Sequence, residues 1–289
     1  MNGISIFTPT YNRAHFLPRC YKSIIDQNFD KVEWIIIDDG SKDNTNEVVS
    51  EFQSQGLIDI TYLYQVNSGK QAAWNKAVGV AKYDYFIGLD SDDAFCSSAL
   101  KKLAAMATVF FDESIIGIRA LSVSPESKEA NNSFSIKSDE KTSWFEEFKS
   151  GIKGERIDLF RTELLKKFKY PVTNDTKFIP EIWLYSRVSK EYQFFYSSLQ
   201  VRLFFDNVSE NRLSRSKLAE HAKGHLLART ALLEELPLKI WLYRPLDLIK
   251  SLVRFYQCIW LLKLKHLETD NRFLRLLSKP LIFINKHRE

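Results

Sequence analysis

Strand and helix signals alternate through about the first 120 residues, and this alternation restricts the possible folds more than any other feature of the chain. Strands that are separated by helices form a mainly parallel sheet with helices packed on its faces. We therefore expect an α/β chain built on such a sheet. The expected strands lie at 4–8, 32–37, 60–64, 85–89 and 115–123, and the expected helices at 16–29, 43–55, 69–81 and 97–111.

Polar residues follow the ends of four of these strands. Parallel strands end at one edge of their sheet, and ligands bind at that edge in open α/β sheets. We therefore expect hydroxyl, amide, cationic and carboxylate groups to converge there. The four segments are Thr10-Tyr11-Asn12-Arg13, Asp38-Asp39-Gly40-Ser41, Asn67-Ser68-Gly69-Lys70 and Asp90-Ser91-Asp92-Asp93.

The last of these segments holds three carboxylates within four positions, directly after the apolar run 86–89. Carboxylates so close together repel one another unless water, a cation or hydrogen-bond donors hold them. Mg²⁺-type ions take oxygen ligands, commonly one or two carboxylates together with substrate phosphates. The segment therefore predicts either a metal–nucleotide site or an acidic, solvated turn, and the other polar strand ends favour the site.

Three motifs occur in a fixed order along the first half of the chain. Together they resemble glycosyltransferase family 2, whose members are inverting enzymes with the GT-A fold. The resemblance covers about the first 120 residues and thins toward residue 215. The motifs are Thr8-Pro9-Thr10-Tyr11-Asn12-Arg13, Ile36-Ile37-Asp38-Asp39-Gly40-Ser41-Lys42-Asp43 and Leu89-Asp90-Ser91-Asp92-Asp93.

The resemblance implies a domain organisation. Residues 1–215 would form a Rossmann-like GT-A domain, with a nucleotide-binding half at 1–120 and an acceptor-binding half at 121–215. Residues 216–289 would form a basic amphipathic helical extension. Within the second half we expect a loop or lid at 124–143, strands at 156–160 and 194–205, and helices at 162–167 and 179–190.

The resemblance also implies a nucleotide-sugar donor, expected to be UDP-linked. Asp39 resembles the carboxylate that accepts a hydrogen bond from the base. The N3–H group of uracil could donate such a bond. Pro9 and Tyr11 could pack on the base, and Arg13 lies beside them. Thr8 belongs to the same expected nucleotide-binding set.

The remaining donor contacts involve Lys70 and the carboxylate cluster. Lys70 could reach the base or the phosphates, or it could be a surface lysine. Asp90 resembles the ribose- and metal-side member of an Asp-x-Asp motif, and Asp92 the metal ligand. The cation, Mn²⁺ or Mg²⁺, would act as a Lewis acid on the departing diphosphate. Asp93 could instead cap the next helix.

Transfer also needs a base for the acceptor hydroxyl. In the family this base is an acidic residue at the start of a helix beyond the sheet. Glu181 fits this role, because it follows Pro180 and lies among aromatic residues that could shield it from water. The family often has Glu-Asp here, whereas Ile182 follows Glu181. Asp175 is the nearby alternative, and Glu181 could also merely favour a helix N-terminus.

Three histidines are candidate site residues. His221 and His225 lie four positions apart on an expected helix, a spacing that could bind a metal. No third ligand accompanies them, so a solvated helix face is the preferred interpretation. His15 could contact the donor, although a surface position is expected.

The C-terminal segment carries the excess positive charge of the chain. Residues 239–289 contain 11 Lys/Arg and 4 Asp/Glu, interleaved with large apolar residues. A basic amphipathic helix suits an anionic membrane surface, and a helix packed on its own domain or on a homodimer partner is the alternative. Nucleic acid is not expected, because no nucleic-acid motif accompanies the charge. Two faces of such a helix can be distinguished. The charged face would carry Asp247, Lys250, Arg254 and Lys265, and the apolar face Leu246, Ile249, Val253, Tyr256 and Trp260.

Other features bear on localisation. Cys20, Cys96 and Cys258 are widely spaced and odd in number, which favours a reducing compartment. The first residues lack the basic segment and cleavage site of a signal peptide, and no stretch approaches the ~20 apolar residues of a spanning helix. We expect a cytoplasmic protein held peripherally at the inner face of the cell membrane.

These patterns predict a metal-dependent inverting glycosyltransferase. Its acceptor, by family-level inference, is a lipid-linked saccharide in bacterial surface polysaccharide biosynthesis. A nucleotidyltransferase or a dinucleotide-binding oxidoreductase is a rival, although no Gly-x-Gly-x-x-Gly follows the first strand. A non-catalytic, membrane-associated nucleotide-binding module is the other rival.

Overall fold

The computed structural model describes residues 3–125, 139–151, 154–205 and 217–286 of the 289-residue chain. Most of the loop or lid expected at 124–143 lies outside these residues. The expected boundary between residues 215 and 216 lies outside them as well.

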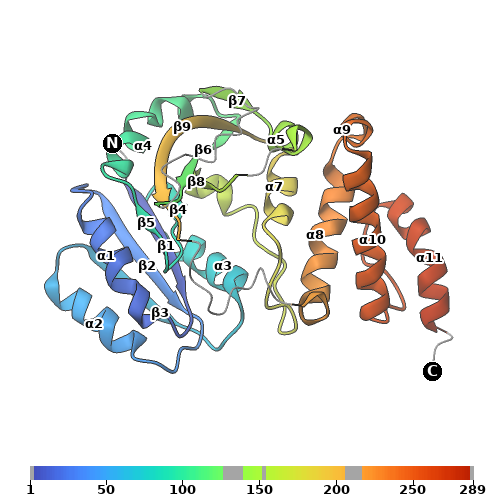
Figure 1. The fold of residues 1–289 in the computed structure, drawn as a ribbon, viewed down its shortest axis with the longest axis horizontal. Helices are drawn as coiled ribbons and strands as arrows, with labels where there is room; N and C mark the ends of the chain where they lie inside the picture. The colour runs from blue at the N-terminus through green and yellow to red at the C-terminus, as the bar shows by residue number, and fades with distance from the viewer. Residues whose placement is uncertain (1–2, 126–138, 152–153, 206–216, 287–289) are drawn as a thin grey trace.

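A single sheet runs through the first two thirds of the chain, with strand order β3-β2-β1-β4-β8-β6-β9-β5 and β7 beside β9 (Figure 1). Its first four strands are parallel to one another, as predicted. They are β3 (Asp59–Tyr64), β2 (Val32–Asp38), β1 (Ile4–Thr10) and β4 (Tyr85–Gly88).

The other half of the sheet is mixed. Strand β8 (Arg156–Arg161) runs antiparallel to both of its neighbours, β4 and β6 (Ile115–Val123). Strand β9 (Gln193–Leu203) is parallel to β6 and pairs antiparallel with the short strands β5 (Ala94–Phe95) and β7 (Glu140–Thr142). The α/β prediction is confirmed, and the mainly parallel sheet contains an antiparallel insertion that the sequence pattern did not predict.

Both faces of the sheet are buried, which explains the uninterrupted apolar run in β2. Side chains alternate along a strand, so Ile35 and Ile37 contribute to one core cluster while Trp34 and Ile36 contribute to the other. Buried parallel strands are continuously apolar for this reason. Helices α1 (Leu17–Ile25), α2 (Thr45–Gln55) and α4 (Ala99–Ala105) cover the second face, and α3 (Lys70–Val80), α5 (Trp144–Ser150), α6 (Thr162–Leu165) and α7 (Ile182–Val188) cover the first.

Two expected helices are shorter than predicted. Asn28 adopts a left-handed backbone with φ of 46°, and α1 ends before it, at Ile25. The helix expected at 97–111 is divided into α4 and a 3₁₀ segment, η2 (Ala107–Phe111). The β-branched and aromatic residues that fill η2 are weak helix formers.

The C-terminal helices form successive layers that lead away from the sheet (Figure 1). Helix α8 packs on α7, α10 packs on α8, and α11 packs on α10. Within the described part of the chain, no helix has the length and apolar character needed to cross a membrane. The elements of the C-terminal region are η4 (Leu218–His221), α8 (Ala222–Glu235), α9 (Leu238–Tyr243), α10 (Pro245–Leu261) and α11 (Arg272–Lys286).

The contact between α8 and the segment that leads to Glu181 includes a close approach of backbone at Gly224. A Cβ atom added to Gly224 would overlap the carbonyl oxygen of Phe178 and come within 3.2 Å of the Cα of Ile179. Helix α8 therefore lies directly against the segment that leads to Glu181.

We expect Gly224→Ala to lower the free energy of unfolding by about 1–3 kcal/mol, because the new methyl group must displace backbone in a packed contact. Gly79→Ala is the matched control, since its Cβ would meet nothing within 4 Å. That control should be neutral or stabilising by up to about 1 kcal/mol, through helix propensity. Urea unfolding measures both, and wild-type stability of the Gly224 variant would contradict a tight backbone contact.

Candidate active site

A cavity of about 790 Å³ opens at the carboxyl ends of the parallel strands, where the sequence predicted the site. It combines carboxylates, basic side chains and aromatic rings from elements far apart in the chain. The predicted site residues that line it are Pro9, Tyr11, Arg13, Asp39, Lys70, Asp90, Asp92, Asp93 and Glu181.

A second cavity of about 130 Å³ adjoins the first. Its size compares with the engineered cavity of about 150 Å³ that accommodates a benzene ring, so it could take one ring-sized group. Aromatic side chains, including Trp74, Tyr170 and Tyr185, form much of its wall. The residues that line both cavities are Lys70, Gln71, Asp90, Glu155, Glu181 and Arg202.

Each carboxylate of the cluster at 90–93 has its own basic partner, and each partner comes from a different element. Pairing of this kind offsets the mutual repulsion of the carboxylates and the cost of their partial burial. The ion pairs are Asp90 with Lys70 (2.9 Å), Asp92 with Arg13 (3.0 Å) and Asp93 with Arg202 (3.2 Å).

The expectation that Asp93 caps the next helix is wrong. Ser98 occupies the N-cap position of α4, whereas Asp93 is 6% exposed and faces Arg202. Burial raises the pKa of Asp93 to about 7, with Arg202 opposing the shift and Asp90 adding to it. Asp93 is therefore an internal member of the charged cluster.

Lys70 is not a free surface lysine. Its ammonium group lies 2.9 Å from Asp90 and 3.7 Å from Glu181, and its side chain is 27% exposed. Burial opposes the charge, but the two carboxylates outweigh it and hold the pKa of Lys70 above its usual value. Lys70 thus joins the carboxylate cluster to the predicted base.

Asp39 has a structural role that the sequence did not predict. One carboxylate oxygen accepts hydrogen bonds from Gln65 Nε2 (2.8 Å) and the Ser68 amide (2.7 Å), and the other accepts from the Gly69 amide (2.9 Å). These bonds hold the turn that precedes α3 and therefore Lys70. A carboxylate has about four acceptor sites, so one remains for a ligand in the cavity.

The structure corrects the prediction for Thr8. This residue is fully buried, its hydroxyl accepts a hydrogen bond from Trp34 Nε1 (2.8 Å), and it lines neither cavity. Thr10 is the threonine that lines the larger cavity. Tyr11 is 39% exposed there, which leaves its ring available for stacking.

Glu181 lines both cavities from the N-cap position of α7. The expected aromatic shielding is not found, because its side chain is 57% exposed and lies beside Lys70. The alternative base, Asp175, lines neither cavity. It binds Lys223 (2.7 Å) and Thr173, and these hydrogen bonds lower the pKa of Asp175 to about 2.

The histidine pair is not a solvated helix face. The rings of His221 and His225 pack against Phe178, with centroids 5.5 and 5.9 Å away, and His221 lines the larger cavity. Burial lowers the pKa of His225 to about 4. His15 is exposed and lines neither cavity, as expected of a surface residue.

Several cavity residues carried no sequence signal. Arg202 is a single charge within an aromatic-rich strand, and Glu155 precedes β8 without any motif. Arg202 is held by Ser122 (2.8 Å) and Glu155 (3.0 Å) as well as by Asp93. Only the pairing of β9 with β5 and β6 brings it to the carboxylates.

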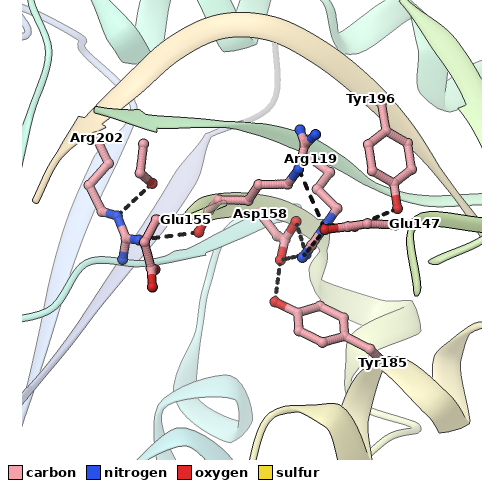
Figure 2. A network of polar contacts seen from close by, with 9 residues as sticks. Arg119, Glu147, Glu155, Asp158, Tyr185, Tyr196 and Arg202 are labelled. Carbon is pink, nitrogen blue, oxygen red and sulfur yellow. Dashed lines mark hydrogen bonds and ion pairs between the residues drawn. The ribbon is translucent and has the colours of Figure 1, made fainter. Parts of the chain in front are cut away.

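A buried polar network supports the wall of the smaller cavity (Figure 2). Arg119 donates to both oxygens of Asp158 (2.6 and 2.9 Å) and to Glu147 (2.7 Å). The hydroxyl of Tyr185 donates to Asp158 (2.7 Å), and that of Tyr196 donates to Glu147 (2.8 Å). Asp158 and Tyr185 line the cavity, so the network fixes their positions.

Asp90 and Asp92 fit a hard divalent cation by the chemistry of their donors. Both present carboxylate oxygens to the larger cavity, beside the basic residues that a phosphate would need. Among the described residues no group of three or more His, Cys, Asp or Glu side chains could hold a metal. Mg²⁺-type ions are commonly bound through one or two carboxylates, with substrate phosphates and waters as the other ligands.

Comparisons with known proteins match the chain to glycosyltransferases. The family model described as "Glycosyl transferase family 2" matches residues 5–168. The glycosyltransferase GlyG of Streptococcus pneumoniae is 36% identical over 101 residues, which cover 35% of this chain and 33% of GlyG. TuaG of Bacillus subtilis is 35% identical over 100 residues, which cover 34% of this chain and 39% of TuaG. The chain thus spans about a third of the length of these curated relatives.

Solved structures share the fold at low identity. TarS 1-349 of S. aureus in complex with UDP-GlcNAc matches with a TM-score of 0.63 and 16% identity, over 98% of this chain and 79% of TarS 1-349. The mannosyltransferase PcManGT of Pyrobaculum calidifontis, in complex with GDP-Man and Mn²⁺, matches with a TM-score of 0.62 and 14% identity. The match covers 98% of this chain and 80% of PcManGT. The expected GT-A architecture is confirmed.

We expect Asp158→Asn to lower the free energy of unfolding by about 3 kcal/mol. This is the lower end of the range for breaking a buried ion pair, because Glu147 still pairs with Arg119. Lys22→Met, which removes an exposed pair with Asp26 (2.9 Å), should change stability by less than about 1 kcal/mol. Urea unfolding compares the two, and equal losses would show that the network is not stabilising.

Proposed function

The chain belongs to glycosyltransferase family 2, and we propose that it transfers a sugar from a UDP-linked donor to an acceptor hydroxyl with inversion at the anomeric carbon. The observation that carries this proposal is the convergence of Asp39, Lys70, Asp92 and Glu181 on one cavity. Similar structures in complex with UDP-GlcNAc and with GDP-Man support a nucleotide-sugar donor, and the first of them supports a UDP-linked one.

The larger cavity would hold the nucleotide. Pro9 and Tyr11 would pack on the base, and the remaining acceptor site of Asp39 would bind the uracil N3–H. Arg13 and Lys70 would bind the diphosphate, because guanidinium and ammonium groups form strong charge-assisted bonds with phosphate oxygens.

The smaller cavity would take the transferred sugar. It adjoins Asp90 and Glu181, has the size of one ring, and is walled by Trp74, Tyr170 and Tyr185. Its wall combines aromatic rings with several charged side chains, and polar groups that converge on an apolar surface suit orientation of such a ligand.

Asp90 and Asp92 would hold Mn²⁺ or Mg²⁺. When bound, such an ion neutralises the charge that develops on a departing diphosphate. The residues of the chain that contribute to the same neutralisation are Arg13, Lys70 and Arg202, all within the charged cluster.

Glu181 would act as the base. Its carboxylate would accept the proton of the acceptor hydroxyl while that oxygen attacks the anomeric carbon from the face opposite the diphosphate. The bond between the anomeric carbon and the diphosphate oxygen breaks in the same displacement, and the nucleoside diphosphate leaves. Exposure of 57% leaves Glu181 open to an acceptor that enters from solvent.

We further propose that the acceptor is a lipid-linked saccharide of a bacterial surface polysaccharide. The name of the similar protein TuaG assigns it to teichuronic acid biosynthesis, which supports this choice. An enzyme with such an acceptor works beside a membrane, and the C-terminal helices offer a surface for that contact.

This surface, the α9–α11 face, is the most apolar exposed part of the described chain. Twelve of the eighteen large apolar side chains that are exposed in the described residues lie on these three helices. Exposed apolar clusters of this kind mark protein or membrane contacts. The twelve residues are Leu238, Leu242, Tyr243, Leu246, Ile249, Val253, Trp260, Leu261, Phe273, Leu276, Phe283 and Ile284.

The structure refines the predicted helical faces. Leu246, Ile249, Val253 and Trp260 are exposed along α10, as expected of one face. Tyr256 is half-buried instead, because its hydroxyl donates to the Leu277 carbonyl (3.0 Å) and ties α10 to α11. The predicted position of Lys265 on that helix is wrong, since α10 ends at Leu261 and Lys263 takes a left-handed φ of 47°.

Helix α11 adds a second basic amphipathic face, within the segment 216–289 for which such character was expected. Phe273, Leu276 and Phe283 are exposed on it, and so are basic side chains on the same helix. Apolar side chains beside positive charge suit the interface of an anionic bilayer. The exposed basic residues are Arg272, Arg275, Lys279 and Lys286.

Glu181→Gln should lower the rate of transfer at least about 100-fold, because a general base contributes a factor of that size. Binding of UDP should be retained. A thermal-shift screen of nucleotide sugars with Mn²⁺ identifies the donor, and release of UDP measures turnover. Wild-type turnover in the variant would exclude Glu181 as the base. Pyrophosphate release would indicate a nucleotidyltransferase, and a binding signal without donor cleavage in the wild type would indicate a non-catalytic module.

The double variant Ile249→Glu/Val253→Glu should lose most binding to liposomes that contain anionic lipid, because it places negative charge on the α9–α11 face. Phe111→Glu is the matched control, since Phe111 is 88% exposed outside that face. Cosedimentation measures the bound fraction. If the double variant sediments as the wild type does, or if the wild type forms dimers that the variant breaks, the membrane assignment fails.

A further inference from the structure

We propose that Arg13 and Lys70 act as internal counter-ions that occupy the metal-binding carboxylates until a nucleoside diphosphate draws them away. Metal and nucleotide would then bind as a coupled pair, each strengthening the other. The inference rests on the proposed function and adds a property of the ligand-free site.

The Arg13–Asp92 pair is the firmer of the two. Its atoms lie 3.0 Å apart, and the side chains are only 17% and 13% exposed. Asp92 is fixed further by Arg19, whose guanidinium donates to the Asp92 backbone carbonyl. A divalent cation that approaches Asp92 therefore meets a carboxylate that is already neutralised by a partly buried guanidinium.

The Lys70–Asp90 pair repeats the arrangement beside it, at 2.9 Å with side chains 27% and 36% exposed. Lys70 also lies 3.7 Å from Glu181, so its positive charge stays within the cavity wall. Both carboxylates that could hold the metal are thus paired with cations of the chain.

Charge balance explains why the metal alone should bind weakly. The two carboxylates that would hold the metal, Asp90 and Asp92, are each matched by one cation of the chain, Lys70 and Arg13. A divalent cation that enters alone adds positive charge beside these basic groups, which repel it. The negatively charged diphosphate that enters with it restores the balance.

A diphosphate also gives Arg13 a better partner. Guanidinium groups bind phosphate oxygens through two parallel hydrogen bonds. Once Arg13 bonds to phosphate, Asp92 is free to bind the cation. Thermodynamic linkage then requires that UDP and metal raise each other's affinity by the same factor.

The test measures Mn²⁺ binding to the full chain by calorimetry, with and without UDP. In the wild type, UDP should tighten Mn²⁺ binding at least about tenfold, within the usual range of coupling between two ligands. Arg13→Met should tighten the binding of Mn²⁺ alone at least about fivefold and reduce the coupling. Arg244→Met is the matched control, because Arg244 pairs with Asp247 away from both cavities; it should leave both affinities unchanged.

A second variant guards against misfolding. Arg13→Lys keeps the charge, so it should bind Mn²⁺ alone as weakly as the wild type does. The proposal is wrong if Arg13→Met binds Mn²⁺ no more tightly than the wild type does. It is also wrong if Arg13→Lys shows the tightened Mn²⁺ binding that is expected of Arg13→Met. Failure of UDP to bind the wild type would instead overturn the proposed function.

Discussion

Pairing of acidic with basic side chains at the end of β4 is the interaction on which the site depends. Three carboxylates lie within four positions, and Asp92 and Asp93 are largely buried. Partly buried charges are tolerated only with close partners and hydrogen bonds. The partners come from the loop after β1, the start of α3 and the C-terminal end of β9, so the cluster joins the parallel half of the sheet to its mixed half.

A second layer of interactions positions those basic partners. Asp39 at the end of β2 holds the turn before α3 and thereby the start of the helix that carries Lys70. Ser122 and Glu155 hold Arg202. The backbone that carries Lys70 and the side chain of Arg202 are therefore held in place by the chain itself, and such preorganisation is what stabilisation of a charged transition state requires.

The predictable part of the molecule is the part in which local pattern decides structure. The run from Val32 to Ile37 is apolar throughout because both faces of β2 are buried, and polar residues follow it because parallel strands end at a ligand-binding edge. Arg202 and the antiparallel direction of β8 depend on strand pairing across long separations, which no local pattern records. Thr8 was misplaced because a motif marks the neighbourhood of a site, while alternation along the strand decides which side chains reach it.

The backbone contact at Gly224 has a consequence for how the extension relates to catalysis. At Gly224 the backbone of α8 lies directly against the segment that leads to Glu181, α10 packs on α8, and α11 packs on α10. A displacement of the outer helices would therefore act on α8, and through α8 on the segment that leads to the predicted base. The extension is therefore coupled to the catalytic half by direct packing. A chimaera joined at this point would have to keep glycine at position 224.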